Sequence, residues 1–316
     1  MKESTLVSVL IPTYNVEKYI EEAVNSILNQ TYRNLEIIII DDCSSDDTFN
    51  ILKSMESKDK RIKLLRNKIN SKIAVTLNNG LKIAKGKYIA RMDGDDISAL
   101  DRIEKKVQFL EDNISFDMVG CSLISIDIYN NKIGKSTSYS DIELLNKTIK
   151  YVSPLSHIWV AKKNVYDKLD GYRNISGVED YDFLLRMKSL GFKFTNIEEY
   201  YGYFVRLGRD GNTISSYGIK QKKLRSYAYS LYKEREKNGS DSFDYQKLSR
   251  VTSTIYFLEK IHSYSSAFLF KSIKLKSQRK YLLMFFYLIL SMISPYQVSY
   301  LLNKLHYSVI IKKYNK

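Results

Sequence analysis

The sequence predicts an α/β fold built on a doubly wound, mostly parallel sheet, followed by a helical and basic C-terminal extension. Three observations predict it. Short apolar runs alternate with helix-spaced segments over the first 115 residues, polar residues follow several of these runs, and the composition changes over the last hundred residues. Alternating strands and helices are typical of a parallel sheet that is covered by helices on both faces.

Four apolar runs supply the predicted strands. The first, Leu6–Ile11, ends in Pro12, and the second, Leu35–Ile40, closes with four consecutive isoleucines. Ile62–Leu65 and Tyr88–Met92 are the third and fourth runs. Because a parallel strand is usually buried on both faces, nearly continuous apolar sequence is typical of such a strand.

Three segments between these strands show the features of helices. Lys18–Gln30 repeats apolar residues at helical spacing, and Lys72–Ala84 is the last helix before Gly86 interrupts the chain. Ser44–Asp47 offers residues that favour helix N-termini, ahead of a helix that ends near Ser57. Strands and helices therefore alternate strictly through this part of the chain.

Polar residues follow three of the four strands. Ligands of parallel sheets bind beyond the carboxyl ends of the strands, so these residues are expected to face one site. An aromatic ring can stack on a base, a carboxylate can accept a hydrogen bond from a base or ribose, and a metal can bridge a diphosphate. The set predicts a nucleotide-diphosphate site. Its members are Thr13, Tyr14 and Asn15 after the first strand, Asp41 and Asp42 after the second, and Asp93–Asp96 after the fourth.

The acidic residues after the fourth strand predict a metal site. Asp93, Asp95 and Asp96 repel one another unless a positive charge joins them, and hard oxygen ligands suit Mg²⁺ or Mn²⁺. The alternative interpretation is an acidic turn at the end of a strand. The chain contains no glycine-rich phosphate loop, so a metal rather than a helix N-terminus is expected to meet the phosphate charge.

Four segments, in chain order, resemble the signatures of glycosyltransferase family 2. They are Val-Ser-Val-Leu-Ile-Pro-Thr-Tyr-Asn (7–15), Ile-Ile-Ile-Ile-Asp-Asp-Cys-Ser-Ser-Asp-Asp-Thr (37–48), Leu-Asn-Asn-Gly (77–80) and Ala-Lys-Gly-Lys-Tyr-Ile-Ala-Arg-Met-Asp-Gly-Asp-Asp (84–96). The resemblance extends from about residue 6 to residue 215. It implies the GT-A fold, a nucleotide-sugar donor and inversion of configuration at the sugar carbon.

The resemblance also implies a nucleotide site. Thr13, Tyr14 and one of Asp41 or Asp42 would hold the nucleoside. Cys43 stands where the family commonly has a glycine, a change that leaves the implied chemistry intact. The further residues of the quoted motifs that are expected to line the nucleotide site are Pro12, Asn15, Asn78, Arg91, Asp93 and Gly94.

Asp93 and Asp95 resemble the family's DxD motif and would bind the metal and the donor diphosphate. Three further residues are possible contacts of the acceptor or the diphosphate, namely Asp96, His157 and Arg206. A lone histidine beside apolar residues is more often a satisfied, half-buried side chain than a catalyst.

The loop that Arg206 opens could close over the diphosphate as a lid, because a guanidinium pairs well with phosphate. Asn212 and Ser215 lie in this loop, and its glycines favour mobility. The alternative is an ordinary surface loop.

An inverting transfer requires a base that takes the proton of the acceptor hydroxyl, on the face opposite the departing diphosphate. The segment 176–187 supplies Glu179 and Asp180 at the start of a predicted helix. Acidic residues are also favoured at helix starts by the helix dipole alone. Glu-Asp ahead of such a helix resembles the family's acceptor-side motif, which implies Asp180 as the base, Glu179 as its neighbour that orients base or acceptor, and Asp182 as the weaker rival.

The basic charge of the chain belongs to its last hundred residues. Residues 216–316 hold 19 Lys and Arg against 5 Asp and Glu, so they carry +14 of the formal net charge of +15. Tyr281–Asn303 contains no charged residue, and Lys271–Lys280 and Lys304–Lys313 flank it. This pattern favours a helical region that lies on an anionic membrane surface. Packing on the catalytic domain, and a spanning or re-entrant helix, are the alternatives, while the charge-free core argues against nucleic acid.

The predicted organisation is a GT-A catalytic domain over residues 1–215 and a helical, basic region over 216–316, for which membrane association is the favoured interpretation. Residues 1–115 form the nucleotide-sugar half of the catalytic domain, and 116–215 the acceptor half. Two cysteines and the absence of a signal-peptide core near Met1 suit the cytoplasmic face of the membrane.

The predicted function is metal-dependent, inverting transfer of a sugar, most simply from a UDP-sugar, to a saccharide acceptor. The basic C-terminal region favours a lipid-linked oligosaccharide of a bacterial surface polysaccharide as that acceptor. A sugar nucleotidylyltransferase and a noncatalytic membrane or nucleic-acid adaptor are the alternatives from other classes. The donor sugar, the acceptor and the linkage depend on loop geometry that the sequence does not reveal.

Overall fold

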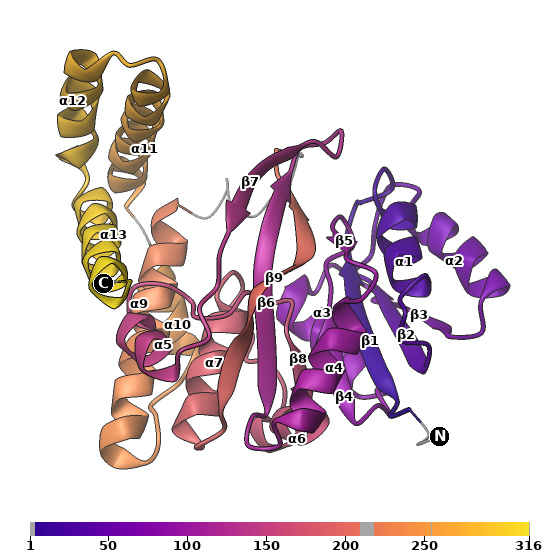
Figure 1. Ribbon diagram of the computed structural model, residues 1–316. Coiled ribbons are helices and arrows are strands. Elements are labelled where there is room, and N and C mark those ends of the chain that lie inside the picture. Colours follow the sequence, from indigo (N-terminus) through magenta and orange to yellow (C-terminus); the bar gives the residue numbers. More distant parts are fainter. Residues whose placement is uncertain (1–3, 209–217, 254, 316) are drawn as a thin grey trace. The chain divides into compact units, whose positions relative to one another are not determined.

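The computed structural model describes residues 4–208, 218–253 and 255–315, and these form two compact units (Figure 1). Met1–Asn146 and Ser153–Asp210 make up the first unit. Lys147–Val152 and Gly211–Lys316 make up the second. The first unit is α/β and the second is helical, which confirms the predicted fold class.

One sheet runs through the first unit, with the described strands in the order β3-β2-β1-β4-β8-β6-β9-β5 and with β7 paired to β6. The strands are β1 (Val7–Thr13), β2 (Leu35–Asp41), β3 (Ile62–Arg66), β4 (Tyr88–Arg91), β5 (Ile97–Ser98), β6 (Met118–Ile126), β7 (Lys132–Ser136), β8 (Val160–Lys162) and β9 (Phe194–Arg206).

The four strands predicted from the sequence are the four parallel neighbours at one side of this sheet. Val7 aligns with Leu35 on one side and with Tyr88 on the other, and Ile37 of β2 aligns with Ile62 of β3. The rest of the sheet is mixed: β8 is antiparallel to both β4 and β6, whereas β9 runs parallel to β6. All four carboxyl ends of β1 to β4 therefore meet at one edge.

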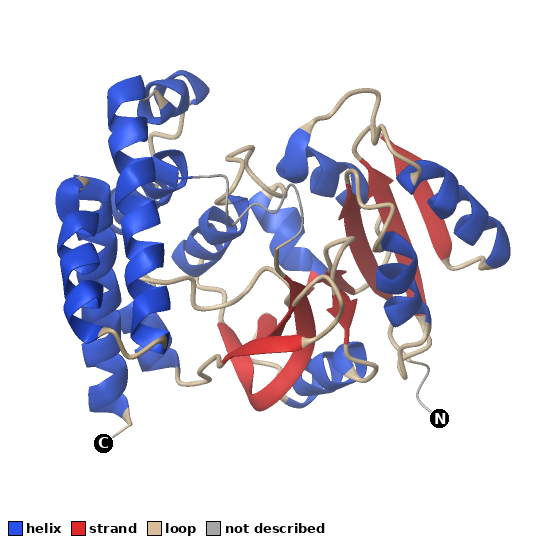
Figure 2. Cartoon of the chain, turned by 90° about the horizontal axis from the view of Figure 1, so that it is seen from above, coloured by secondary structure: helices blue, strands red, loops and turns tan. Residues whose placement is uncertain are grey.

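Helices cover both faces of the parallel strands, as Figure 2 shows at its right. The helices that begin in this unit are α1 (Ile20–Leu28), α2 (Thr48–Lys58), α3 (Lys72–Leu81), α4 (Arg102–Asp112), α5 (Ile142–Thr148), α6 (Lys163–Leu169) and α7 (Glu179–Ser189). They include the helices that the sequence predicts, with ends that differ by a few residues.

Alternate residues of the strands enter two apolar layers. Val9 and Ile11 belong to a buried cluster with apolar residues of α1, α2 and α4. Leu10 points to the other face, where Gly80 of α3 lies so close that a Cβ atom would stand 2.7 Å from Ile40 Cδ1. The Leu-Asn-Asn-Gly segment therefore needs its glycine for the packing of α3 on the sheet.

The second unit contains only helices among its described residues. They are α9 (Gly218–Asn238), α10 (Tyr245–Thr252), α11 (Tyr256–Ser277), α12 (Tyr281–Leu290), the 3₁₀ turn η1 (Ser291–Ile293) and α13 (Pro295–Tyr314). Lys147–Val152 belongs to this unit, where Tyr151 stacks on His306. No single described helix is long and apolar enough to cross a membrane, although Tyr281–Ile293 and Pro295–Tyr314, bent by 120°, meet the length and composition criteria as a pair.

Candidate active site

The loops that follow β1 and β2 are tied together by reciprocal hydrogen bonds. The amides of Asn15 and Glu17 donate to Ser44 Oγ (3.0 Å) and Asp46 Oδ2 (3.1 Å). In return, the Ser45 amide donates to Asn15 Oδ1 (2.9 Å). The backbone amides of the loop after β1 have no partner in a sheet or helix, so they need side-chain acceptors. Ser44 and Asp46, which the sequence predicts as N-caps of α2, supply these acceptors.

Asp41 and Asp42, at the end of β2, have different environments. Asp42 Oδ1 accepts hydrogen bonds from Asn67 Nδ2 (2.8 Å) and the Ser71 amide (2.7 Å), so its role is structural. Asp41 is fully buried, and its Oδ2 lies 3.2 Å from Arg66 Nε. Its Oδ1 is buried without a hydrogen-bond partner among the described residues. A buried acceptor without a donor is costly, so Asp41 is the better candidate for a contact with a ligand.

The end of β1 meets the turn that follows β4. A Cβ atom on Gly94 would stand 2.8 Å from Thr13 Cγ2, so only glycine allows this approach. Pro12 and Thr13 are buried in β1, whereas the ring of Tyr14 is 46% exposed and free to stack on a planar ligand. Cys43 has a φ of 63°, in the left-handed region that favours glycine.

Arg206, at the end of β9, holds the acidic turn after β4. Its amide donates to Asp96 Oδ1 (2.8 Å), and its Nε donates to the carbonyl of Asp95 (2.9 Å). The guanidinium is buried and also pairs with Glu22 of α1 at 2.9 Å. These contacts give Arg206 a positioning role, and the predicted contact with a diphosphate stays a prediction.

The acidic turn fits a divalent cation. Asp93, Asp95 and Asp96 can each offer one carboxylate oxygen within 4.8 Å of the others. Burial, together with the charges of Asp95 and Asp93, raises the pKa of Asp96 well above its usual range. A divalent cation with a preference for oxygen ligands would relieve this repulsion, so the residues present suit Mg²⁺ or Mn²⁺.

A chain of charged side chains joins the acidic turn to the start of α7. Arg91 of β4 lies 3.3 Å from Asp93 Oδ1 and 3.3 Å from Glu179 Oε1. His157 Nε2 lies 2.9 Å from Asp93 Oδ2, and its Nδ1 lies 4.0 Å from Asp180 Oδ2. The metal candidate and the base candidate therefore lie on opposite sides of one imidazole ring.

The charges of this chain are set by burial and by the partners. Burial lowers the pKa of His157, but the carboxylate of Asp93 outweighs this effect and raises it. Burial also opposes the charge of Arg91, yet Asp93 and Glu179 raise its pKa. Burial and the charge of Asp180 raise the pKa of Glu179. The sequence predicts His157 as a half-buried side chain or as a contact of the acceptor or diphosphate. In the structure it lies between Asp93 and Asp180.

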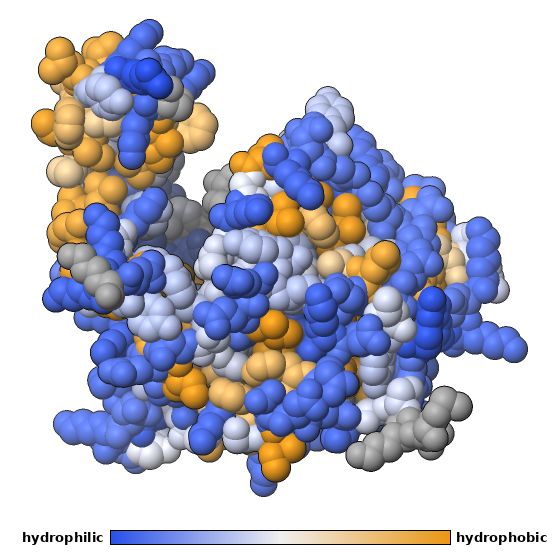
Figure 3. Space-filling view, in the orientation of Figure 1, coloured by the Kyte–Doolittle hydropathy of each residue, from blue (hydrophilic) through white to orange (hydrophobic). Residues whose placement is uncertain are grey.

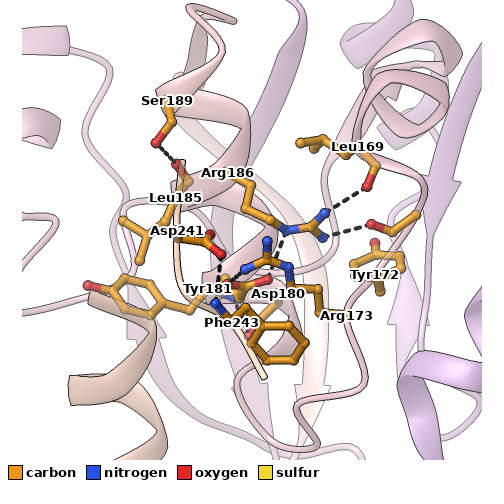
Figure 4. Close-up of polar contacts among 12 residues, drawn as sticks. Leu169, Tyr172, Arg173, Asp180, Tyr181, Leu185, Arg186, Ser189, Asp241 and Phe243 are labelled. Atoms are coloured by element: carbon orange, nitrogen blue, oxygen red, sulfur yellow. Dashed lines mark hydrogen bonds and ion pairs between the residues drawn. The ribbon is translucent and has the colours of Figure 1, made fainter. Parts of the chain in front are cut away.

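Asp182 is committed to structure, in contrast to Asp180. It is fully buried, and its Oδ2 accepts a hydrogen bond from Arg186 Nε (2.9 Å), while Arg173 Nη1 lies 3.8 Å from Oδ1. Arg186 also donates to the carbonyl of Leu169 (2.7 Å), as Figure 4 shows. The side chain of Asp180 is 25% exposed, so it is the carboxylate that an acceptor can reach.

Asn78 bridges two parts of the fold. Its Nδ2 donates to the carbonyl of Tyr172 (2.8 Å), and its Oδ1 accepts from the Tyr172 amide (2.9 Å). These bonds give Asn78 a structural role, and the predicted nucleotide contact stays untested. The predicted lid residues Asn212 and Ser215 lie outside the described part of the chain.

Two contributors to the site are missing from the sequence prediction. The buried hydroxyl of Tyr203 in β9 accepts a hydrogen bond from the Asp93 amide (3.0 Å). Arg66 pairs with Asp41 from the end of β3. Arg66 directly follows a predicted strand, so its position at the shared edge could have been found, whereas the role of Tyr203 depends on the crossing of distant strands.

Two buried cations of α4 support the segment that carries His157. Lys106 Nζ and Arg102 Nη1 donate to the carbonyl of Ile158, at 2.8 Å and 3.0 Å. Both side chains are fully buried. Burial lowers the pKa of the Lys106 ammonium to about 8. The fold therefore binds the Lys106 proton less tightly than the unfolded chain does.

This difference predicts a pH-dependent stability. Between pH 8 and the ordinary lysine value of 10.5, the unfolded state holds more protons, so the folded state gains stability as pH rises. Relative to Lys106→Met, the wild type should gain on the order of 3 kcal/mol across this window, measured by urea unfolding. Lys105→Met, at an exposed position of the same helix, is the control and should show far less change. A wild-type-minus-Lys106→Met difference that is independent of pH would contradict the assignment.

Comparisons with known proteins agree with this geometry. The family model described as Glycosyl transferase family 2 matches residues 8–190. EpsE of Bacillus subtilis (strain 168), which is named as a glycosyltransferase on a provisional basis, is 35% identical to this chain over 237 residues. The match covers 73% of this chain and 80% of EpsE. WfaP of Escherichia coli, named UDP-Glc:alpha-D-GlcNAc-diphosphoundecaprenol beta-1,3-glucosyltransferase, is 34% identical over 231 residues, 68% of this chain and 88% of that protein.

Solved structures show the same fold. The crystal structure of residues 1–349 of S. aureus TarS in complex with UDP-GlcNAc has a TM-score of 0.63 and 21% identity, covering 98% of this chain and 91% of that one. A mannosyltransferase from Pyrobaculum calidifontis, in complex with GDP-Man and Mn²⁺, has a TM-score of 0.59 and 16% identity, covering 96% and 88%. At these identities, the likeness establishes the fold.

Proposed function

The chain belongs to glycosyl transferase family 2 and is a glycosyltransferase, and from this premise we propose that it transfers a sugar, with inversion, from a UDP-sugar to a saccharide acceptor. The observation that carries the proposal is the placement of the acidic turn and Asp180 on opposite sides of His157. The family match and the relatives named as glycosyltransferases favour this function over a sugar nucleotidylyltransferase or a noncatalytic adaptor.

The nucleoside would lie at the ends of β1 and β2. Asp41 Oδ1, buried and without a partner in the described chain, can accept a hydrogen bond from uracil N3–H. The exposed ring of Tyr14 can stack on the base. Thr13 and the loop that Asn15 fixes to Ser45 would form the floor of this subsite.

The diphosphate would lie at the acidic turn. Asp93 and Asp95 would hold Mn²⁺ or Mg²⁺, which supplies positive charge for the departing diphosphate. Burial favours the neutral form of Asp93, but His157 and Arg91 together outweigh it and hold the pKa of that carboxyl well below its usual range, so Asp93 stays ionised. Arg206 fixes the turn through the Asp95 carbonyl, so its contribution is positional.

The transfer itself would be a single displacement. The acceptor oxygen forms a bond to the anomeric carbon while the bond from that carbon to the diphosphate oxygen breaks, and the electron pair leaves with UDP. Asp180 takes the proton of the acceptor hydroxyl. Glu179 is buried and paired with Arg91, which places the start of α7 and hence Asp180.

A donor panel tests this function. Purified protein is incubated with several UDP-sugars and with GDP-mannose, with Mn²⁺ or with a chelator, and the released nucleotide is measured. We expect release of UDP from at least one UDP-sugar, lost on chelation. Release of GDP alone, or release that ignores chelation, would refute the proposed donor or the proposed metal dependence.

The assignment of the uracil contact makes a specific prediction. Asp41→Asn should weaken UDP binding by at least about tenfold, because the amide group that replaces the free oxygen is itself a donor. The same amide can donate to cytosine N3, so the affinity for CDP should fall less. Calorimetric titration with both nucleotides measures the two effects. Unchanged preference for UDP over CDP would move the uracil contact away from Asp41.

The acceptor is proposed to be lipid-linked, at the cytoplasmic face of the membrane. WfaP, by its name, acts on a diphosphoundecaprenol-linked sugar. Residues 216–316 carry a formal charge of +14, whereas residues 1–215 carry +1, so the C-terminal region is the part that suits an anionic membrane surface. A bacterial surface polysaccharide is the matching product class.

A further inference from the structure

The helices α11, α12 and α13 bury polar side chains and expose apolar ones. Seven of the side chains described in α11, α12, η1, α13 and the linking Ser294 are buried, and six of these are polar. Leu275 is the one apolar member. The six polar members are His262, Ser265, Ser272, Ser291, Ser294 and Gln297. We call these six residues the polar seam.

The polar seam consists of hydrogen bonds between helices. Ser272 Oγ of α11 donates to the Met284 carbonyl of α12 (3.0 Å), and Ser265 Oγ donates to the Ser291 carbonyl of η1. His262 Nδ1 lies 2.9 Å from Ser294 Oγ at the start of α13. Hydrogen bonds from small polar side chains therefore join the helices, beside the aromatic contact of Phe268 with Tyr287.

The outer surface of α12 is apolar around its circumference. Its sequence is Tyr-Leu-Leu-Met-Phe-Phe-Tyr-Leu-Ile-Leu, and none of these residues is buried. Leu282 is 90% exposed, and Phe286 is 55% exposed. Figure 3 shows apolar atoms gathered on the α12 side of this hairpin, with hydrophilic atoms at its tip. An amphipathic helix that lies on a membrane keeps one polar face, and α12 has none.

The first helix of the same unit shows the opposite pattern. α9 buries apolar residues, among them Leu224, Ala228 and Leu231, as helices in water do. Apolar residues outside and small polar residues between helices are expected where lipid replaces water, because lipid gives no drive to bury apolar surface and interhelical hydrogen bonds join the helices.

We propose that α12, together with the apolar side chains that α11 and α13 expose, lies among the acyl chains of one leaflet of an anionic membrane, with lipid around α12 except where it packs on α11. Charge supports this partner, since the uncharged Tyr281–Asn303 is flanked by Lys271–Lys280 and Lys304–Lys313. α12 spans about 15 Å, roughly half of the hydrocarbon thickness.

This inference deepens the proposed lipid-linked acceptor and rests on the helices alone. Lipid contact is therefore measured without a sugar donor, and UDP release without vesicles. Failure of one measurement leaves the other intact, so the two proposals can fail separately.

Quenching by brominated lipids tests the inference on the full-length protein. Trp159, the one tryptophan of the chain, is fully buried in the first unit and serves as the unquenched reference. Phe286→Trp adds a reporter on α12, and Tyr245→Trp adds a control of similar exposure on α10. In vesicles of phosphatidylcholine and phosphatidylglycerol with acyl-chain bromines, we expect the Phe286→Trp signal to be quenched at least about twofold more than the control.

Three outcomes would overturn the inference. Equal quenching of the two reporters would show that α12 does not enter lipid, and quenching only by bromines near the headgroups would show that it lies on the surface. A vesicle-free dimer that Leu282→Gln converts to a monomer, without any lipid quenching, would assign the apolar surface to a second copy of the chain. In a flotation assay, the full-length protein should bind pure phosphatidylcholine vesicles more weakly than the mixed anionic vesicles, because the basic flanks then have no anionic headgroups to contact.

Discussion

Asp180→Asn is expected to reduce glycosyl transfer by at least about 10², while binding of the nucleotide donor is retained. Asparagine keeps the shape of the side chain and the hydrogen bond from the Tyr181 amide to its oxygen (2.7 Å). It cannot take the proton of the acceptor hydroxyl. Initial rates of sugar transfer and calorimetric titration with UDP, on the same preparation, separate the two effects.

Two further variants show whether the loss is specific to Asp180. Asp182→Asn should lower the melting temperature, because Asp182 is buried between Arg186 and Arg173, while the folded protein keeps most of its transfer activity. Asp167→Asn, at an exposed site on α6, should change neither property. Near-normal transfer by Asp180→Asn would move the base to Glu179 or Asp182.

Asp95→Ala is expected to abolish turnover, with a loss of at least about 10³. The carboxylate lies in the acidic turn, within 4.8 Å of those of Asp93 and Asp96, where the cation for the diphosphate would bind. Alanine removes one ligand and leaves the backbone carbonyl that Arg206 holds. Turnover is measured over a range of Mn²⁺ and Mg²⁺ concentrations.

An acidic residue outside the turn provides the comparison for Asp95→Ala. Glu21→Gln removes one negative charge from the exposed face of α1 and should leave both turnover and its metal dependence unchanged. Substantial metal-dependent turnover in Asp95→Ala would exclude Asp95 as a ligand.

The parallel half of the sheet could be predicted because its strands are buried on both faces. The end of Leu35–Ile40 is four consecutive isoleucines, and such a run has few other uses than a central strand. The mixed half could not be predicted in this way. β9 (Phe194–Arg206) contains two glutamates and pairs with β6 through shifts in register, so its place depends on contacts far along the chain.

The sequence predicts that the site lies at the ends of the strands, but not which hydrogen bonds and ion pairs connect its residues. Asp41 and Asp42 are adjacent acids, and only the bonds of Asn67 and Ser71 reveal that Asp42 is committed to the fold. The position of His157 between Asp93 and Asp180 likewise depends on tertiary structure.

In the helical region, the periodicity of the sequence does not predict which face of a helix is buried. Serines and apolar residues both recur at helical spacing in α11, so the sequence pattern is compatible with either set facing inward. The structure places Ser265 and Ser272 inside and leaves Phe270 and Ile273 exposed. That choice distinguishes a lipid-facing helix cluster from a water-facing one.

Binding of UDP in the presence and absence of metal tests the claim that the acidic turn, with Asp93 and Asp95 as ligands, binds a divalent cation together with the nucleotide diphosphate. Titration calorimetry of the wild-type protein with UDP, in Mn²⁺ and in a chelator, is predicted to show affinity at least about tenfold tighter with Mn²⁺. Equal affinity in the two conditions would contradict the claim.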